Sequence, residues 1–179
     1  VGDADLDQVV NDLAGAAFGS AGERCMALPV VVPVGDETAD RLKAKLIPAI
    51  EALKVGISTD AEAHYGPVVT AAHKAKVEGW IQTSIDEGAE LVVDGRGFKL
   101  QGHEEGFFIG PTLFDRVTTD MSSYTEEIFG PVLSILPARD EAEPVSIANG
   151  TIYGLNGAVW SADMARAVRV ARQMQCGKV

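Results

Sequence analysis

Hydrophobic residues along this chain either recur at helical spacing or stand in short continuous runs, and each pattern predicts one kind of element. From Leu6 to Phe18 the apolar residues recur at helical spacing and form one stripe. Asp3 or Asp5 is a candidate N-cap for this helix, and Gly19 follows its end. Similar stripes predict helices over residues 38–53, 70–87 and 162–175.

A proline or a glycine marks where two of these helices should end. Pro48 lies inside the second helix and predicts a kink or an early stop, because proline has no N–H to donate. Gly88 follows the third helix as its expected end. In the last helix, Met164 and Val168 belong to the stripe that should face the core.

Short apolar runs without alternation predict strands. Residues 28–34 are rich in valine, as in a parallel strand buried on both faces. Further strands are predicted over 89–94 and 131–136, and the polar, glycine-rich stretch 95–106 is a hairpin or surface loop. Strands that alternate with helices imply an α/β fold, a three-layer sandwich with a mainly parallel sheet.

Composition places the 179 residues in a single globular domain, with 46% apolar and 23% charged residues. A net charge of −11 argues against a nucleic-acid partner, which would require clustered lysine and arginine. The longest apolar run, residues 27–34, is far too short to span a membrane. The chain has no initiator Met and no signal peptide, so we expect it to be a piece of a longer protein.

The two cysteines, Cys25 and Cys176, show no metal spacing and fit free thiols in a reducing compartment. The expected location is the cytoplasm, or the mitochondrial matrix if the host is a eukaryote. The three histidines share no spacing with one another or with Cys25, so none is expected to be a metal ligand or a triad base.

Cys25 stands out because of the residues around it. It follows a helix and a turn of small residues, and an apolar strand begins just after it. The neighbouring Arg24 would favour the thiolate, which is the form that attacks carbon. A small buried hydrophobe is the alternative interpretation of a single cysteine.

Two motifs resemble those of a known family. Gly-Glu-Arg-Cys-Met-Ala over residues 22–27 resembles the catalytic cysteine segment of aldehyde dehydrogenases, most closely the methylmalonate-semialdehyde type. Glu-Glu-Ile-Phe-Gly-Pro-Val over residues 126–132, about a hundred residues further on, resembles the cofactor-ribose motif. Residues 106–113 resemble a third landmark, a strand before a Pro-Thr turn.

The resemblance changes near residue 141. Beyond this point the chain is more similar to the general NAD-dependent aldehyde dehydrogenases, and Pro144 interrupts a segment that is usually helical. A divergent member of the family and a chain assembled from two sources are both compatible with this change.

The resemblance assigns roles to five residues. Cys25 is the nucleophile, and its own backbone N–H is a candidate donor to the oxyanion. Glu127 would bind the nicotinamide ribose and Phe129 would pack beside it, with a surface carboxylate and a core phenylalanine as the alternatives. Arg24 would bind a substrate carboxylate, or else only pair with a neighbour or activate the thiol. Phe18 is a candidate for the substrate tunnel, although core packing is its simpler role.

The resemblance also implies an activity. It is NAD-dependent oxidation of a small aldehyde, a malonate or methylmalonate semialdehyde, through a thiohemiacetal and a thioacyl-enzyme, with coenzyme A as the acyl acceptor. A hydrolytic enzyme that yields the free acid and an inactive isolated piece are the alternatives. Residues 1–179 would be the cysteine-bearing catalytic domain of a homodimeric or homotetrameric parent, without most of the NAD-binding and oligomerisation parts.

Overall fold

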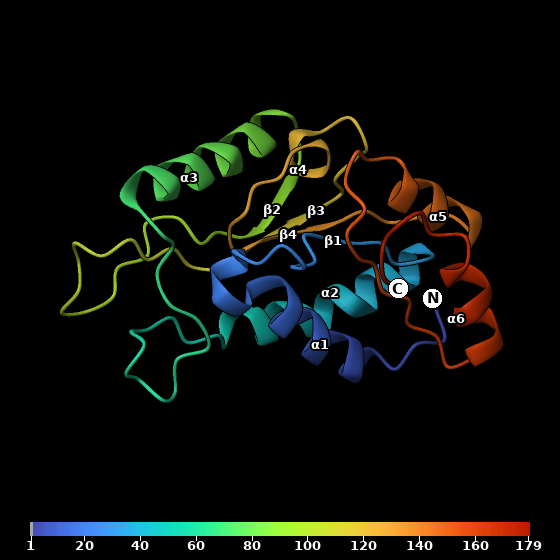
Figure 1. Cartoon of the computed structure of the whole chain (residues 1–179), viewed down its shortest axis with the longest axis horizontal. Helices are drawn as coiled ribbons and strands as arrows, with labels where there is room; N and C mark the ends of the chain where they lie inside the picture. The colour runs from blue at the N-terminus through green and yellow to red at the C-terminus, as the bar shows by residue number, and fades with distance from the viewer. Residues whose placement is uncertain (1) are drawn as a thin grey trace.

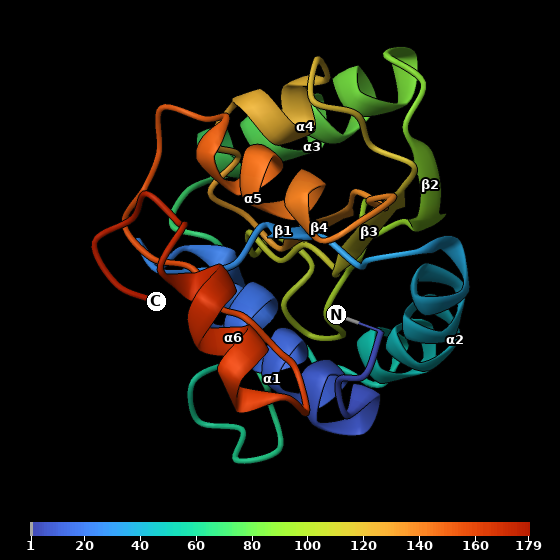
Figure 2. The same ribbon diagram turned by 90° about the vertical axis from the view of Figure 1, so that its right-hand side faces the viewer.

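The computed structural model describes residues 2–179 and arranges them as a sheet between two layers of helices (Figure 1). One face of the sheet is covered by α1 (Leu6–Phe18) and α2 (Asp36–Glu51), and the other by α3 (Ala71–Asp86) and α4 (Ser122–Thr125). Seen from the side, α5 (Ala142–Asn149) lies on the α3 side of the sheet and α6 (Met164–Ala171) lies beside α1 (Figure 2). The predicted three-layer α/β fold is therefore confirmed.

The described sheet has four strands. In spatial order they are β1 (Val30–Val31), β4 (Val132–Ile135), β3 (Thr112–Asp115) and β2 (Glu90–Val93). Ser134 in β4 lies opposite Val30 on one side and Phe114 on the other, and both pairings are parallel. Only β2 runs antiparallel, against β3. The sheet is thus mainly parallel, as predicted.

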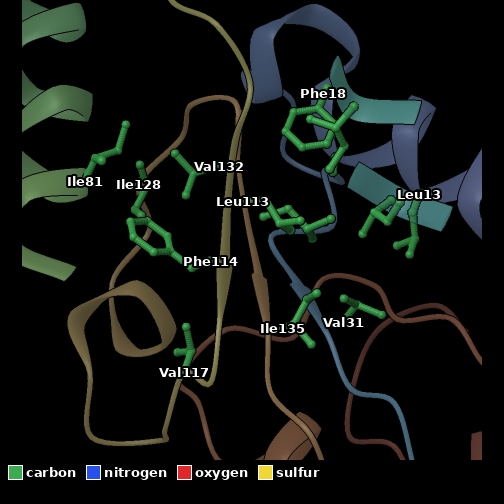
Figure 3. Close-up of a cluster of buried hydrophobic side chains, with 14 of the residues drawn as sticks. Leu13, Phe18, Val31, Ile81, Leu113, Phe114, Val117, Ile128, Val132 and Ile135 are labelled. Atoms are coloured by element: carbon green, nitrogen blue, oxygen red, sulfur yellow. The ribbon is translucent and has the colours of Figure 1, made fainter. Parts of the chain in front are cut away.

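The core lies on both faces of this sheet because successive side chains of a strand point in opposite directions. Leu113 of β3 points toward Leu13 and Phe18 of α1, whereas Phe114 lies on the face covered by Ile81 of α3 (Figure 3). All five side chains are fully buried. Burial of each such side chain stabilises the fold by about 1.5–3 kcal/mol.

Local side-chain caps fix where two of the predicted helices begin. The Oδ1 atom of Asp5 accepts hydrogen bonds from the first-turn N–H groups of α1, so Asp5 and not Asp3 is the cap. Thr70 caps α3 in the same way, and Gly88 follows the end of α3 with a φ of +102° that favours glycine. Both helices keep the bounds predicted from sequence to within one residue.

Helix α2 ends earlier than its apolar stripe. It stops at Glu51, three residues after Pro48, so the early stop predicted from that proline is confirmed. No helix within residues 2–179 is both long and apolar enough to cross a bilayer.

Two strand predictions were wrong in extent. Of residues 28–34, only Val30 and Val31 form a ladder, and Val30 is half-buried, because β1 is the edge strand and borders a cavity. The strand expected before the Pro-Thr turn lies after it. Pro111 has no N–H to donate, and the pairing begins when the N–H of Thr112 bonds to the carbonyl of Pro131 at 2.8 Å.

The C-terminal third also departs from expectation. Helix α6 is shorter than predicted, and Met164 and Val168 of its apolar stripe are exposed while Val170 is buried. Pro144 does not interrupt a helix, because it lies in the first turn of α5, where its N–H would have no partner. The short helix α4 gave no apolar pattern and was not predicted.

One partly buried ion pair ties the α2 layer to the sheet. Lys43 of α2 lies 2.5 Å from the carboxylate of Asp115 at the end of β3, and Asp115 is only 3% exposed. The hydrogen bond to Asp115 raises the pKa of Lys43, so the ammonium of Lys43 stays protonated at neutral pH.

Candidate active site

Cys25 lies in an exposed turn that directly follows a strained stretch of backbone. After α1 the chain enters the short helix η1 (Gly19–Gly22), where Ser20 and Ala21 take φ values of +55° and +56°. The following turn is closed by a 3.0 Å hydrogen bond from the N–H of Ala27 to the carbonyl of Arg24. Cys25 carries a free, exposed thiol, and its backbone N–H has no acceptor among the described residues. The alternative of a small buried hydrophobe is therefore wrong.

A close contact between two glycines joins the cysteine loop to the second motif. A Cβ atom on Gly22 would lie 2.1 Å from the carbonyl oxygen of Gly130, and the φ of Gly22 is +71°. Both facts require glycine at position 22. The contact brings together two segments that lie about a hundred residues apart in the sequence.

The two motifs border one cavity of about 450 Å³, a volume within the usual range of small-molecule sites. Cys25 and Glu127 both line it, and Glu127 is exposed. Most of the remaining wall is apolar, with side chains from β1, α5 and the segment that precedes α6. The structure thus brings together the predicted nucleophile and the predicted ribose-binding carboxylate beside an apolar chamber.

Phe129 is held at the edge of this arrangement. The residue is 36% exposed, and its backbone is left-handed, with a φ of +57°. Its carbonyl oxygen lies 2.7 Å from Nε2 of His73 in α3, and the two rings meet edge to face at 6.4 Å between centroids. Phe129 is therefore not a core residue, and it lies next to Glu127 without lining the cavity.

Arg24 points back toward α1. Its Nη2 atom donates to the carbonyl oxygens of Gly15 and Ala16, at 2.5 and 3.2 Å, which are among the last carbonyls of that helix. Gly19 leaves room for the guanidinium, since a Cβ there would lie 2.7 Å from Nη2. Arg24 does not pair with Glu23 in this arrangement and does not line the cavity of Cys25. Its role toward a substrate stays a prediction.

Phe18 lies in the core and not beside Cys25. It is fully buried and packs near Leu13 and Leu113 between α1 and the sheet (Figure 3). It is absent from the wall of the cavity that Cys25 lines. Core packing, the simpler interpretation of Phe18, accounts for this placement.

Sequence reasoning missed two residues at or beside the site, His73 and Tyr124. His73 was given no role, yet it contacts Phe129 and lies 3.3 Å from the carboxylate of Glu23. Tyr124 lines the cavity and donates to the carbonyl of Ile147 at 2.7 Å, and burial raises its pKa, so it stays neutral. Neither residue belongs to a local motif, so only the fold reveals them.

Comparison with protein families gives a match over the whole chain. The model of the aldehyde dehydrogenase family matches residues 1–179. A malonate-semialdehyde dehydrogenase of Pseudomonas aeruginosa is 50% identical over 177 residues, which cover 99% of this chain and 36% of the relative. A mitochondrial acylating methylmalonate-semialdehyde dehydrogenase of Arabidopsis thaliana is 41% identical over 99% of this chain and 29% of its own length. The chain spans about a third of the length of these relatives.

Solved structures agree with this match. A methylmalonate-semialdehyde dehydrogenase from Oceanimonas doudoroffii superposes with a TM-score of 0.94 at 46% identity, covering 97% of this chain and 36% of that one. A betaine aldehyde dehydrogenase from Staphylococcus aureus, in complex with NAD+, gives 0.95 at 33% identity, covering 99% and 35%.

Proposed function

The chain belongs to the aldehyde dehydrogenase family, and from that premise we propose that its protein oxidises an aldehyde with NAD through a thioester on Cys25. One observation carries the proposal. Cys25 and Glu127, from motifs about a hundred residues apart, line the same cavity of about 450 Å³. A nucleophile and a ribose-binding carboxylate must share one chamber if hydride is to leave the carbon that the thiolate attacks.

Glu127 and Phe129 fit a nicotinamide nucleotide. The exposed carboxylate of Glu127 can accept hydrogen bonds from two neighbouring ribose hydroxyls. The partly exposed ring of Phe129, two residues on, offers an apolar surface beside that sugar. When bound, the nicotinamide ring supplies the acceptor for the hydride that leaves the substrate.

The chemistry at Cys25 then proceeds in three stages: addition, hydride loss and acyl transfer. Its thiolate adds to the aldehyde carbon, and the carbonyl electron pair moves to oxygen, where the N–H of Cys25 can donate to it. Loss of a hydride from this carbon oxidises the thiohemiacetal to a thioester. The thiol of coenzyme A attacks the thioester, its proton goes to solvent, and Cys25 leaves as the thiolate.

The proposed substrate is malonate or methylmalonate semialdehyde. The names of the relatives and the position of Arg24 next to the nucleophile support this choice. Three carboxylates, Glu126, Glu127 and Glu141, border the cavity, so an anionic substrate needs a cation nearby. Arg24 lies outside the wall of this cavity, where bonds to Gly15 and Ala16 hold its guanidinium in place, so a substrate carboxylate that reaches it would meet a preformed cation.

The chain itself is proposed to be the cysteine-bearing part of a longer enzyme. The relatives are about three times as long, and by analogy with them the rest would supply most of the NAD-binding half, the second oxyanion donor and the contacts of a homodimer or homotetramer. The whole protein is therefore the right material for every experiment. An isolated piece of 179 residues without activity would not contradict the proposal.

The test is NADH formation by the whole protein from malonate semialdehyde, with and without coenzyme A. We expect Cys25→Ala to abolish turnover and Cys176→Ala, which removes the other thiol, to retain it. Acyl-coenzyme A should appear in step with NADH. Turnover that persists in Cys25→Ala would contradict the assignment of the nucleophile, and turnover that is independent of coenzyme A would favour the hydrolytic alternative.

A further inference from the structure

We propose that His73 is a positioning residue that fixes the cysteine loop and the cofactor-side turn in one geometry, an inference that rests on the proposed function. Three segments far apart in the sequence meet at its side chain. They are the loop that contains Glu23, the first turn of α3 and the turn at Phe129.

The contacts define which atom acts. Nε2 of His73 lies 2.7 Å from the carbonyl oxygen of Phe129 and 3.3 Å from Oε1 of Glu23. Both partners are acceptors, so Nε2 carries the proton and its N–H is shared between these two oxygen atoms. The imidazole is 16% exposed and the Glu23 side chain 15%, so water competes poorly for these bonds.

The backbone around His73 is fixed as well. Its N–H donates to Oγ1 of Thr70, the N-cap of α3, at 3.1 Å. The N–H of Val69 donates to Oε1 of Glu23 at 3.2 Å, so Glu23 is tied to the start of α3 by two contacts. The carboxylate two residues before Cys25 is therefore anchored to the same helix that carries the imidazole.

On the cofactor side, His73 bonds to the strained turn at Phe129. A non-glycine residue is strained in the left-handed region, and Phe129 remains there with its carbonyl directed at His73. One turn further along α3, Val77 packs against Gly130, where a Cβ would lie 2.7 Å from Cγ2 of Val77. Gly130 in turn contacts Gly22 of the cysteine loop.

The consequence concerns the spacing of reacting groups. A continuous packed contact runs from α3 to the cysteine loop through Val77, Gly130 and Gly22. His73 adds the hydrogen bond that sets the orientation of the Phe129 peptide. Without the Nε2 donor, the Phe129 peptide can turn toward an unstrained conformation. Glu127 and Phe129 would then shift relative to Cys25, and a small misplacement of this kind lowers both cofactor affinity and hydride transfer.

The experiment compares a variant that keeps the ring with one that keeps the donor. His73→Phe retains a flat ring against Phe129 but cannot donate, whereas His73→Gln has an amide donor of similar reach. In the whole protein we expect His73→Phe to raise both the Kd for NAD, measured by calorimetry, and the KM for NAD. The expected change is about three- to tenfold, the range for one or two net hydrogen bonds.

The remaining expectations separate positioning from a general loss of structure. The KM for the aldehyde should change less than about twofold, because the bond from the N–H of Val69 to Glu23 still anchors the cysteine loop. His73→Gln should recover most of the affinity for NAD. His103→Leu is the matched control, since His103 is an exposed imidazole beside another ring, that of Phe108, and should behave as wild type.

Each outcome bears on one proposal. Wild-type Kd and KM for NAD in His73→Phe, or an equal loss in His73→Gln with the melting temperature intact, would overturn the role of His73. If His73→Phe does not fold, His73→Ala provides the same comparison with His73→Gln. A wild-type protein that binds NAD but oxidises no aldehyde would contradict the proposed function instead, and the calorimetric comparison would still test His73.

Discussion

At the scale of single residues, Arg24 is the side chain whose proposed role concerns substrate choice. Its guanidinium is fixed to two carbonyls at the end of α1 through Nη2. Within residues 2–179, its Nε and Nη1 atoms make no hydrogen bond. A planar cation held in this way can still offer two donors to a carboxylate, and lysine could not reproduce that geometry.

We expect Arg24→Leu in the whole protein to lower kcat/KM for malonate semialdehyde by about tenfold or more. Arg24 is exposed in the described chain, so a loss of this size requires the substrate and the rest of the protein to shield it from water. Loss of one member of a charge pair shielded in this way typically costs about 2–5 kcal/mol. Propanal has no carboxylate and should lose much less, which steady-state kinetics on both aldehydes would measure. Arg24→Lys is the matched variant and should fall between wild type and Leu. Equal losses for the two aldehydes would show that Arg24 serves the thiolate and not the substrate.

At the scale of elements, the cysteine loop depends on the close approach of η1 to the turn before β4. Gly22 and Gly35 both have positive φ, but only Gly22 meets another backbone. A Cβ on Gly35 would have no atom within 4 Å. Alanine substitutions at the two glycines therefore separate the free-energy cost of backbone strain from the cost of steric overlap.

For this pair we expect Gly35→Ala to lower the free energy of unfolding by about 1–3 kcal/mol, the cost of its positive φ without any overlap. Gly22→Ala should lose about 2–5 kcal/mol, because overpacking against Gly130 adds to that strain. Urea denaturation of the whole protein would measure both. Gly22→Ala should also displace Cys25 and reduce NADH formation, and equal stability losses in the two variants would argue against the overlap.

At the scale of the whole molecule, ion pairs join the two ends of the described chain. Arg166 of α6 lies 3.1 Å from Asp3 and 3.5 Å from Glu141, and Arg169 lies 2.5 Å from Glu141. Val170 is the one buried hydrophobic residue within α6, so apolar packing holds this helix only weakly. Its attachment therefore depends strongly on charge.

Acid should loosen α6 before it unfolds the sheet. Desolvation acts to raise the pKa of Asp3, but the hydrogen bond from Ser161 and the charge of Arg166 outweigh it, so the pKa lies below its ordinary value. A carboxyl with a lowered pKa in the folded state stabilises that state above the unfolded pKa. This contribution is lost as the pH falls below about 4 and through the folded pKa.

Hydrogen exchange, corrected for the intrinsic rate at each pH, would follow this loss. We expect amides of α6 to lose protection at acid pH while β4 stays protected, since all four residues of β4 are buried. Arg166→Met should produce the same loosening at neutral pH. If α6 and β4 lose protection together in both experiments, the ionic attachment is not the weak point.

The sequence by itself determined the features that depend on local physics. A side-chain cap and an apolar stripe of its own predict each of α1 and α3, and a mainly apolar run predicts β4. The same holds for the two motifs that indicated the family, because each is a continuous run of residues. Cys25 and Glu127 are identifiable as candidate site residues from these motifs alone.

Only the tertiary structure decided which faces are covered and which distant residues meet. Val30 is half-buried because β1 is an edge strand, and the apolar stripe of α6 is exposed because the helix attaches through Arg166 and Arg169. His73 had no motif around it, and its proposed role rests on contacts with residues 50 and 56 positions away. Burial and long-range contact are properties of the packed chain, and a local pattern carries no information about them.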